Sequence, residues 1–280
     1  MPQRAGQLVV IGGAEDHAGR AVILRRFRDL CGGEHARIAI LGTATMIPAE
    51  VGEGYLKAFR ALGVKEVVFL PLASRAAASS TKTIEVLEGV DGVFFTGGSQ
   101  RRITAIVGGS RVDAWLHQKL QRGLVIAGTS AGAAMMSSTM ILGDILGDSD
   151  TMPATSIVSL GPGLGFLPGV VIDMHMTERR RLTRLLAAVT RFPHHLGIGI
   201  DEDTALIVDG NRFEVIGAGT VTVIDAGDAT SMSGPNGERP IALTGMLIHV
   251  LAAGYAFNLT TRSVEITTGP EAARGLSRAS

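Results

Sequence analysis

The sequence has very little cysteine and no excess of charge. Its 280 residues include a single cysteine, Cys31, so an internal disulfide is excluded. Cys31 stands at an expected helix end, where neither a helix N-terminus nor a basic neighbour would activate the thiol, and we interpret it as a small buried residue. Lysine plus arginine and aspartate plus glutamate number 26 each, so the formal net charge is zero. This balance argues against nucleic acid or an anionic membrane as a partner.

Long apolar runs and common cofactor motifs are also missing. No run approaches the roughly 18 apolar residues of a membrane-spanning helix. Residues 1–6 lead into a strand without the features of a signal peptide, so we expect a cytoplasmic protein. Spacings such as H-x-x-x-H are absent, and we expect no metal ion and no other cofactor. The first strand is followed by Gly12-Gly13-Ala14-Glu15 rather than G-x-G-x-x-G, which puts an acid where a phosphate would lie and makes nucleotide binding the weaker interpretation.

What the sequence does contain is an alternation of apolar strands and amphipathic helices. Hydrophobic residues make up 46% of the chain, enough for a sizeable core, and the 37 glycines indicate many tight turns. The alternation is typical of a mostly parallel α/β sheet flanked by helices on both faces. The expected strands cover residues 7–11, 37–41, 66–70, 92–96, 124–127, 169–174, 198–200 and 205–208, and the expected helices cover 20–30, 50–62, 81–87, 112–120 and 177–190.

The pattern changes in the second half of the chain. The glycines and prolines within 141–165 favour a long loop. Asp209-Gly210-Asn211 predicts a hairpin turn, and four apolar runs near it are expected to be antiparallel strands, at 213–216, 221–224, 245–251 and 264–267. We therefore expect one α/β domain over residues 1–280, with a parallel core at 7–208 and a C-terminal antiparallel β extension at 209–269.

The most informative stretch is the apolar run 124–127 followed by Gly128-Thr129-Ser130-Ala131-Gly132. It fits the G-x-S-x-G nucleophile elbow, in which a sharp strand-to-helix turn exposes the serine hydroxyl. The two glycines matter because a side chain at either would collide with the neighbouring strand or helix. Backbone N–H groups of the following helix would stabilise an oxyanion formed there. The alternative is an ordinary serine N-cap.

A nucleophilic serine needs a base, and His175 is the best placed of the seven histidines. It follows the apolar run 170–174, which puts it at the carboxyl edge of the sheet, the same edge as Ser130. His17, in the first glycine-rich loop, is the alternative. The remaining histidines are expected to be surface or packing residues: His35, His117, His194, His195 and His249.

An acid should orient the base, and Asp201-Glu202-Asp203 follows the strand at 198–200 at the same edge. The sequence leaves open which of the three acids does so. It also leaves open a solvated turn, or an acid from the long loop, namely Asp144, Asp148 or Asp150.

Basic residues open the helix expected after His175. Arg179, Arg180, Arg181 and Arg184 put positive charge at a helix N-terminus, against the macrodipole. An unfavourable local arrangement of this kind indicates a functional use, such as binding of carboxylates. A solvated basic face remains the alternative for at least one of them.

Five motifs in chain order together resemble the cyanophycinases of peptidase family S51, relatives of peptidase E with a class I glutamine amidotransferase-like fold. These are Ile-Gly-Gly-Ala-Glu-Asp at 11–16, Thr-Gly-Gly-x-Gln at 96–100, Gly-Thr-Ser-Ala-Gly-Ala at 128–133, Asp-x-His at 173–175 with the arginines, and Gly-Ile-Asp-Glu-Asp-Thr at 199–204. The resemblance covers nearly the whole chain. It implies a cytoplasmic serine exopeptidase, expected to be a homodimer, that releases β-Asp-Arg dipeptides from cyanophycin, a poly-aspartate with arginine on each β-carboxyl group.

The resemblance also implies a role for each matching residue. Ser130 would be the nucleophile, His175 the base and Glu202 the orienting acid, with backbone N–H groups of Gly98 and Ala131 as the oxyanion hole. The expected substrate-binding residues are Gln100, Asp173, Arg179, Arg181 and Arg184. Arginines suit the free carboxylates of the polymer, and an acid such as Asp173 suits its guanidinium groups.

The sequence departs from the family where Met174 stands in place of glutamine and Met176 in place of an aromatic residue. Loss of an amide in the pocket would weaken polymer recognition or shift the preference to another peptide. Two alternatives therefore stay open. One is an Asp-specific or isoaspartyl dipeptidase of the peptidase E type, and the other is a non-catalytic binding protein on the same scaffold.

Overall fold

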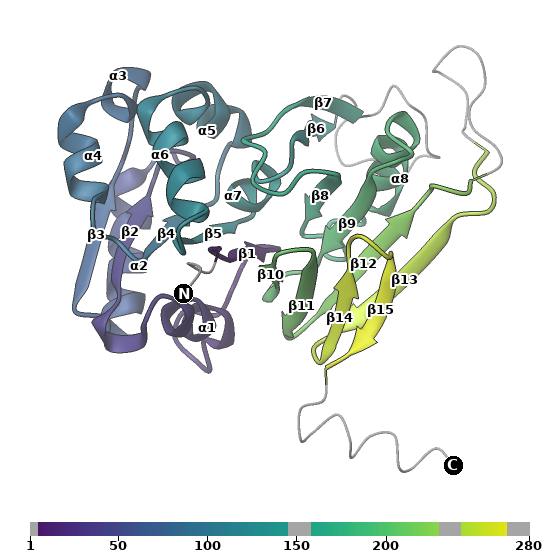
Figure 1. Ribbon diagram of the computed structural model, residues 1–280, viewed down its shortest axis with the longest axis horizontal. Coiled ribbons are helices and arrows are strands. Elements are labelled where there is room, and N and C mark those ends of the chain that lie inside the picture. Colours follow the sequence, from purple (N-terminus) through teal and green to yellow (C-terminus); the bar gives the residue numbers. More distant parts are fainter. Residues whose placement is uncertain (1–4, 145–157, 230–241, 268–280) are drawn as a thin grey trace.

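A nine-stranded mixed sheet runs through the molecule (Figure 1). The structure is a computed structural model and describes residues 5–144, 158–229 and 242–267. One half of the sheet is parallel, as the sequence predicts. In spatial order it contains β1 (Leu8–Ile11), β5 (Val125–Thr129), β4 (Gly92–Phe95), β2 (Arg37–Leu41) and β3 (Glu66–Leu70).

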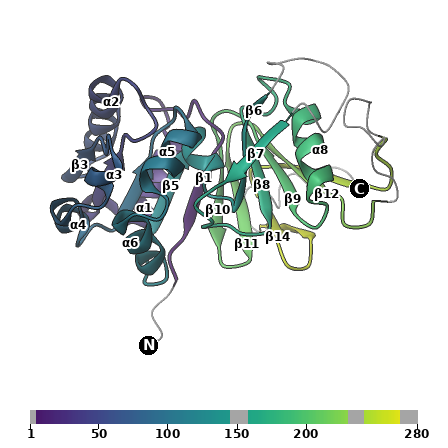
Figure 2. The same ribbon diagram turned by 90° about the horizontal axis from the view of Figure 1, so that it is seen from above.

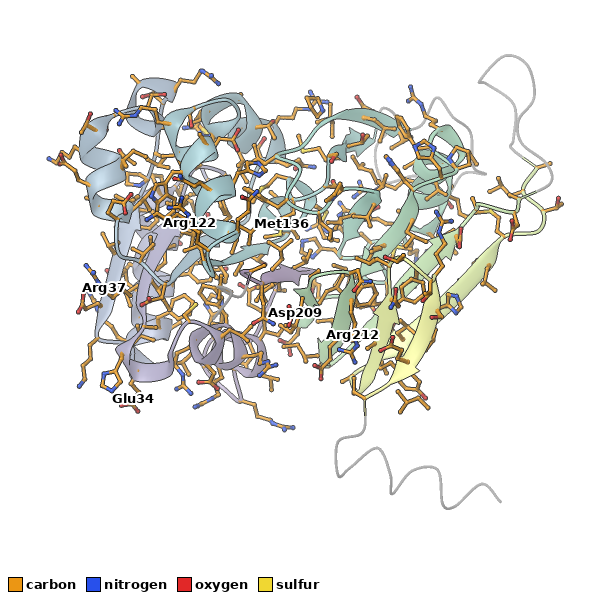
Figure 3. All side chains as sticks on the ribbon, in the orientation of Figure 1. Glu34, Arg37, Arg122, Met136, Asp209 and Arg212 are labelled. Carbon is orange, nitrogen blue, oxygen red and sulfur yellow. The ribbon has the colours of Figure 1, made fainter. Side chains whose placement is uncertain are left out.

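The other half of this sheet is antiparallel. It consists of β10 (Thr204–Asp209), β11 (Arg212–Gly217), β14 (Tyr255–Asn258) and β15 (Ser263–Ile266), with β10 paired to β1. Asp209 and Arg212 pair across the turn that joins β10 to β11, where the sequence predicts a hairpin (Figure 3). The expectation that the run at 205–208 belongs to the parallel core is wrong. An apolar run predicts a buried strand but carries no information about its direction.

A second sheet contains the strands that precede and follow the arginine-rich segment 179–184 in the sequence. Its order is β13-β12-β9-β8, and only β8 (Val170–Met174) and β9 (Leu196–Ile200) run parallel. The helix α8 (Leu182–Arg191) connects these two strands, while β12 (Thr220–Asp225) and β13 (Leu247–Ala252) extend the sheet antiparallel. The strand before His175 therefore lies outside the sheet of the elbow, contrary to the single sheet that the sequence predicts.

Two local expectations in this region are also wrong. The stretch expected as a loop contains a hairpin of β6 (Thr139–Asp144) and β7 (Val158–Pro162), whose glycines hide the strand pattern. The helix expected over 177–190 begins only at Leu182, because Arg180 adopts a φ of 51° that no α-helix continues through. Leu182, the first residue of this helix, is 44% exposed.

Helices cover both faces of the parallel half of the large sheet (Figure 2). Along β2, Ile38 and Ile40 pack with the helices α1 (Val22–Leu30) and α2 (Pro48–Ala61). Ala39 and Leu41 point to the opposite face, because successive strand side chains alternate. The helices on that face are α3 (Arg75–Ala78), α4 (Thr81–Leu87), α5 (Gln100–Val107) and α6 (Arg111–Leu120), and short pieces elsewhere are η1 (Gly33–His35) and α7 (Ala131–Ala134). Among the described residues, no helix is long and apolar enough to cross a membrane.

Candidate active site

The turn between β5 and α7 has the geometry of a nucleophile elbow. Ser130 has a φ of 51° and a ψ of −110°, a conformation that side-chain-bearing residues rarely adopt. Its N–H donates to the carbonyl of Ile11 at 3.0 Å, which ties the elbow to the neighbouring strand. A Cβ on Gly128 would lie 2.5 Å from the carbonyl carbon of Gly132, and one on Gly132 would lie 2.6 Å from the carbonyl oxygen of Phe95. Both glycines are therefore required by close backbone approach.

The side chain of Ser130 does not cap α7. Instead, its Oγ lies 2.8 Å from Nε2 of His175. The N-cap alternative is thus wrong, and the histidine that the sequence favours is the one in contact with the serine. His17, the alternative base, approaches Glu15 instead, at 3.5 Å.

His175 reaches the elbow from the second sheet through a strained turn. Its φ is 52°, and its N–H donates to the carbonyl of Gly12 at 3.0 Å. This hydrogen bond anchors the end of β8 to the glycine-rich loop after β1. The imidazole is 7% exposed and lies over Gly13, where a Cβ would be 2.6 Å from Nε2. The loop after β1 thus positions His175, whereas the sequence predicts that a shared sheet edge does so.

Of the three adjacent acids after β9, Glu202 faces His175. Its Oε1 lies 2.6 Å from Nδ1 of His175. Asp201 turns away to accept hydrogen bonds from the backbone N–H groups of Thr177 and Thr220, and Asp203 accepts one from the N–H of Asp16. The side chains of Asp144, Asp148 and Asp150 lie outside the described residues.

Electrostatics keep the imidazole neutral near pH 7. Burial lowers the pKa of His175 below its ordinary value of 6.5, and the positive charges of Arg179 and Arg181 lower it further. The hydrogen bond with Glu202 raises the pKa and offsets part of this effect. With Nδ1 donating to Glu202, Nε2 is left with a lone pair directed at Ser130, which is the tautomer that this hydrogen-bond network selects.

Backbone donors lie beside the serine. Ala131 begins α7 directly after Ser130, and the neighbouring Gly97-Gly98 loop passes the elbow, since a Cβ on Gly97 would be 3.5 Å from that of Ser130. Gly98 has a φ of 138°, and a Cβ there would lie 2.6 Å from the carbonyl carbon of Ala44. Within the described part of the chain, the N–H groups of Gly98 and Ala131 have no acceptor. They are available to bind an oxyanion.

The residues expected to bind substrate form a different group. Asp173 is fully buried, and its two carboxylate oxygens accept from Nε and Nη2 of Arg184 at 2.7 and 2.5 Å. Arg181 is buried and donates through Nη1 to the carbonyl of Met174 at 2.7 Å, whereas Arg179 is exposed. Gln100 donates to the carbonyl of Ile141 at 2.8 Å. Asp173, Arg181 and Arg184 thus form a buried ionic cluster under the turn that carries His175.

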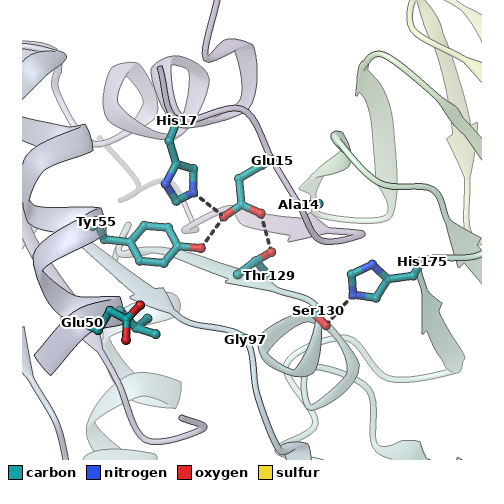
Figure 4. A pocket seen from close by; sticks show the side chains of 11 residues that line it. Ala14, Glu15, His17, Glu50, Tyr55, Gly97, Thr129, Ser130 and His175 are labelled. Atoms are coloured by element: carbon teal, nitrogen blue, oxygen red, sulfur yellow. Dashed lines mark hydrogen bonds and ion pairs between the residues drawn. The ribbon is translucent and has the colours of Figure 1, made fainter. Parts of the chain in front are cut away.

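An open cavity of about 600 Å³ adjoins the serine on the side of α2 (Figure 4). The carboxylate of Glu15 lines this cavity and accepts hydrogen bonds from Tyr55 Oη at 2.5 Å and from Thr129 Oγ1 at 2.6 Å. Burial alone would raise the pKa of Glu15, but the hydrogen bonds from His17, Thr129 and Tyr55 outweigh it, and the pKa lies below its ordinary value. We refer to this space as the Ser130 cavity; its lining is Ala14, Glu15, His17, Glu50, Val51, Gly54, Tyr55, Gly97, Thr129, Ser130 and His175.

Sequence reasoning missed the buried Glu15 and its donors. The available signal was an acid in an apolar, glycine-rich loop at the carboxyl end of a strand, where ligands bind in sheets of this kind. Among the described residues, no group of three or more His, Cys, Asp or Glu side chains is arranged to hold a metal ion.

The model of Peptidase family S51 matches residues 8–216. The chain belongs to peptidase family S51.

Its relatives in that family match over most of their length. The cyanophycinase of Trichormus variabilis is 37% identical over 261 residues, which cover 92% of this chain and 87% of that protein. The cyanophycinase of Geminocystis herdmanii is 37% identical over 259 residues, 91% of this chain and 94% of that protein. The crystal structure of a peptidase from an acI-B1 Actinobacterium is similar in fold, with a TM-score of 0.67 at 18% identity over 92% of this chain and 98% of that one. The match to family S51 confirms the predicted resemblance and assigns the chain to a family of peptidases. The cytoplasmic location and the homodimer stay predictions.

Proposed function

We propose that this protein is a serine exopeptidase that hydrolyses cyanophycin to β-Asp-Arg dipeptides. The observation that carries the proposal is the hydrogen-bonded chain from Ser130 Oγ to His175 Nε2 and from His175 Nδ1 to Glu202 Oε1, at 2.8 and 2.6 Å. A serine, a histidine and an acid at these distances have the geometry of a catalytic triad. The substrate is inferred from the names of the relatives, which are cyanophycinases.

In the first half of the reaction, Ser130 Oγ attacks the carbonyl carbon of the scissile amide. As the Oγ–C bond forms, the hydroxyl proton passes to Nε2 of His175, and Glu202 stabilises the resulting imidazolium through Nδ1. The negative charge that develops on the carbonyl oxygen accepts hydrogen bonds from the N–H groups of Gly98 and Ala131. His175 then returns the proton to the leaving nitrogen as the C–N bond breaks, which leaves an ester on Ser130.

In the second half, water replaces the amine. His175 Nε2 takes a proton from the water as its oxygen attacks the ester carbon. The same backbone donors bind the second oxyanion, and the protonated His175 gives its proton back to Ser130 Oγ as the ester bond breaks. The free carboxylate product leaves, and the serine and the neutral imidazole are restored.

The test is to incubate purified protein with cyanophycin and to identify the products by mass spectrometry, with the Ser130→Ala variant alongside. We expect β-Asp-Arg from the wild type only, and labelling of Ser130 by a serine-directed phosphonate. Release of dipeptide by Ser130→Ala at the wild-type rate would overturn the proposed mechanism. Absence of phosphonate labelling together with absence of turnover would favour a non-catalytic binding protein.

The second candidate is an Asp-specific or isoaspartyl dipeptidase. The observation that favours it is Met174, which stands where the resemblance implies a glutamine, is 4% exposed, and accepts a hydrogen bond from Arg181 through its carbonyl. A labelled serine with no dipeptide released from the polymer, but with hydrolysis of Asp-X or β-Asp-X dipeptides, would select this candidate.

A further inference from the structure

The charged groups around the Ser130 cavity are acidic. Glu15 and Glu50 both line it, and no described lysine or arginine does (Figure 4). The other titratable side chains of the lining are His17, Tyr55 and His175. The charged lining residues are thus carboxylates, which favour a positively charged occupant.

The two acids differ in what they already bind. Glu15 is 6% exposed and is held by Tyr55 and Thr129, so its charge is fixed in place beside the nucleophile. Glu50 is exposed, in the first turn of α2, and forms no ion pair or hydrogen bond with any described residue. Glu50 is thus free to meet a cation that enters the cavity.

Two aromatic rings line the cavity beside Glu15, tilted by 53° to each other. The rings of His17 and Tyr55 lie with their centroids 4.6 Å apart, and Figure 4 shows both on the side of the cavity opposite His175. Planar guanidinium groups pack well on aromatic faces and pair with carboxylates through several N–H donors. The cavity thus offers both interactions to a guanidinium whose chain leads away from Ser130.

The acid first expected to bind such a group is not accessible. Asp173 has no exposed surface, and both of its oxygens already contact Arg184. A substrate guanidinium could reach this carboxylate only by displacing a buried arginine, and exchange of one buried ion pair for another gains little free energy. Glu50 is exposed and requires no such displacement.

We propose that the Ser130 cavity binds a cationic side chain of the substrate, of guanidinium type, and that Glu50 is the residue that selects for positive charge. This inference rests on the proposed function only in using Ser130 as the reacting group. The binding itself depends on the cavity and its charge.

The test separates charge from shape by comparing two ligands of the same size. N-acetyl-arginine amide and N-acetyl-citrulline amide differ in the guanidinium, which citrulline replaces with a neutral urea. Binding of each to the Ser130→Ala protein is measured by NMR titration, so that turnover plays no part. We expect the arginine ligand to bind roughly tenfold more tightly, and Glu50→Gln to remove this difference. Glu50→Lys should weaken arginine binding further.

Glu53→Gln is the matched control, because Glu53 is exposed on the same helix and does not line the cavity. It should bind both ligands as the parent protein does. Equal affinity for the two ligands, or an arginine affinity that Glu50→Gln leaves unchanged, would overturn the inference even if the enzyme degrades cyanophycin. A retained arginine preference in a protein that cleaves nothing would instead reject the proposed function and leave the cation-binding cavity standing.

Discussion

The imidazole of His175 occupies the space that a side chain on Gly13 would need. A Cβ at Gly13 would lie 2.6 Å from Nε2 of His175 and 2.9 Å from Nδ1, and Gly13 also has a φ of 112°. The imidazole of His175 therefore packs directly on the glycine-rich loop after β1. The backbone of this loop also accepts hydrogen bonds from the N–H groups of His175 and Asp203, and the last residue of β1, Ile11, accepts one from Ser130.

The first prediction follows from the close contact between Gly13 and the imidazole of His175. Gly13→Ala should lower kcat on cyanophycin by about 100-fold or more, because a displacement of the base by about 1 Å costs that much in a positioned reaction. The measurement is steady-state kinetics together with the rate of phosphonate labelling of Ser130. The matched control is Gly32→Ala, because Gly32 has a φ of 111° but no atom within 4 Å of its added Cβ. Equal activity of the two variants would contradict the steric explanation.

The second prediction concerns the choice among the acids. Glu202→Gln should reduce kcat by about 10³- to 10⁴-fold, because the amide no longer stabilises the imidazolium or fixes the tautomer of His175. Asp203→Asn should keep most of the activity, since an amide oxygen can still accept the N–H of Asp16. Steady-state rates for the two variants decide the matter. A larger loss for Asp203→Asn than for Glu202→Gln would mean that the orienting acid has been misassigned.

The position of Glu202 also shows how much of the site could be predicted from the sequence. The run Asp201-Glu202-Asp203 after a buried strand was enough to predict an acid near the base, because strand ends converge at one edge. The direction of each side chain depends on the turn, in which Asp203 has a φ of 46° and the N–H of Asp203 donates to the carbonyl of Gly13. Such directions follow from contacts between distant segments, which local residue patterns do not encode.

The elbow and the parallel strands were predictable because they depend on local residue patterns. The shape of the turn around Ser130 follows from Gly128 and Gly132, which are local features of the chain. The second sheet was not predictable, because its strands have the same apolar composition as those of the first. The buried pair of Asp173 and Arg184 was also missed, because charged residues in a sequence are expected at the surface or in a substrate pocket.

The third prediction is the pH dependence of turnover. His175 must be neutral to accept the proton, so kcat/KM should fall as the pH drops through the pKa of His175, which lies below 6.5. Arg179 lowers this pKa by disfavouring the imidazolium. Arg179→Gln should therefore raise the pKa and move the acidic limb of the profile to higher pH.

The control for this shift is Arg60→Gln, since Arg60 is an exposed residue in the last turn of α2 and is not one of the charged groups that act on the pKa of His175. Its acidic limb should coincide with that of the wild type, whatever its effect on KM. The measurement is the pH profile of kcat/KM for the three proteins. An acidic limb that moves to lower pH in Arg179→Gln would contradict the electrostatic account of this site.

The fourth prediction distinguishes a structural role for Asp173 from a role in contacting substrate. Asp173→Ala takes away a carboxylate in direct contact with the buried guanidinium of Arg184, and loss of one partner of a buried ion pair typically costs about 3–5 kcal/mol. We therefore expect a fall of this size in the free energy of unfolding, measured by chemical denaturation without substrate. Glu50→Gln, at an exposed position, should leave that free energy within about 0.5 kcal/mol of the wild type. If Asp173→Ala were as stable as the wild type and only its KM rose, the carboxylate would be contacting substrate directly, and the pairing with Arg184 would open when substrate binds.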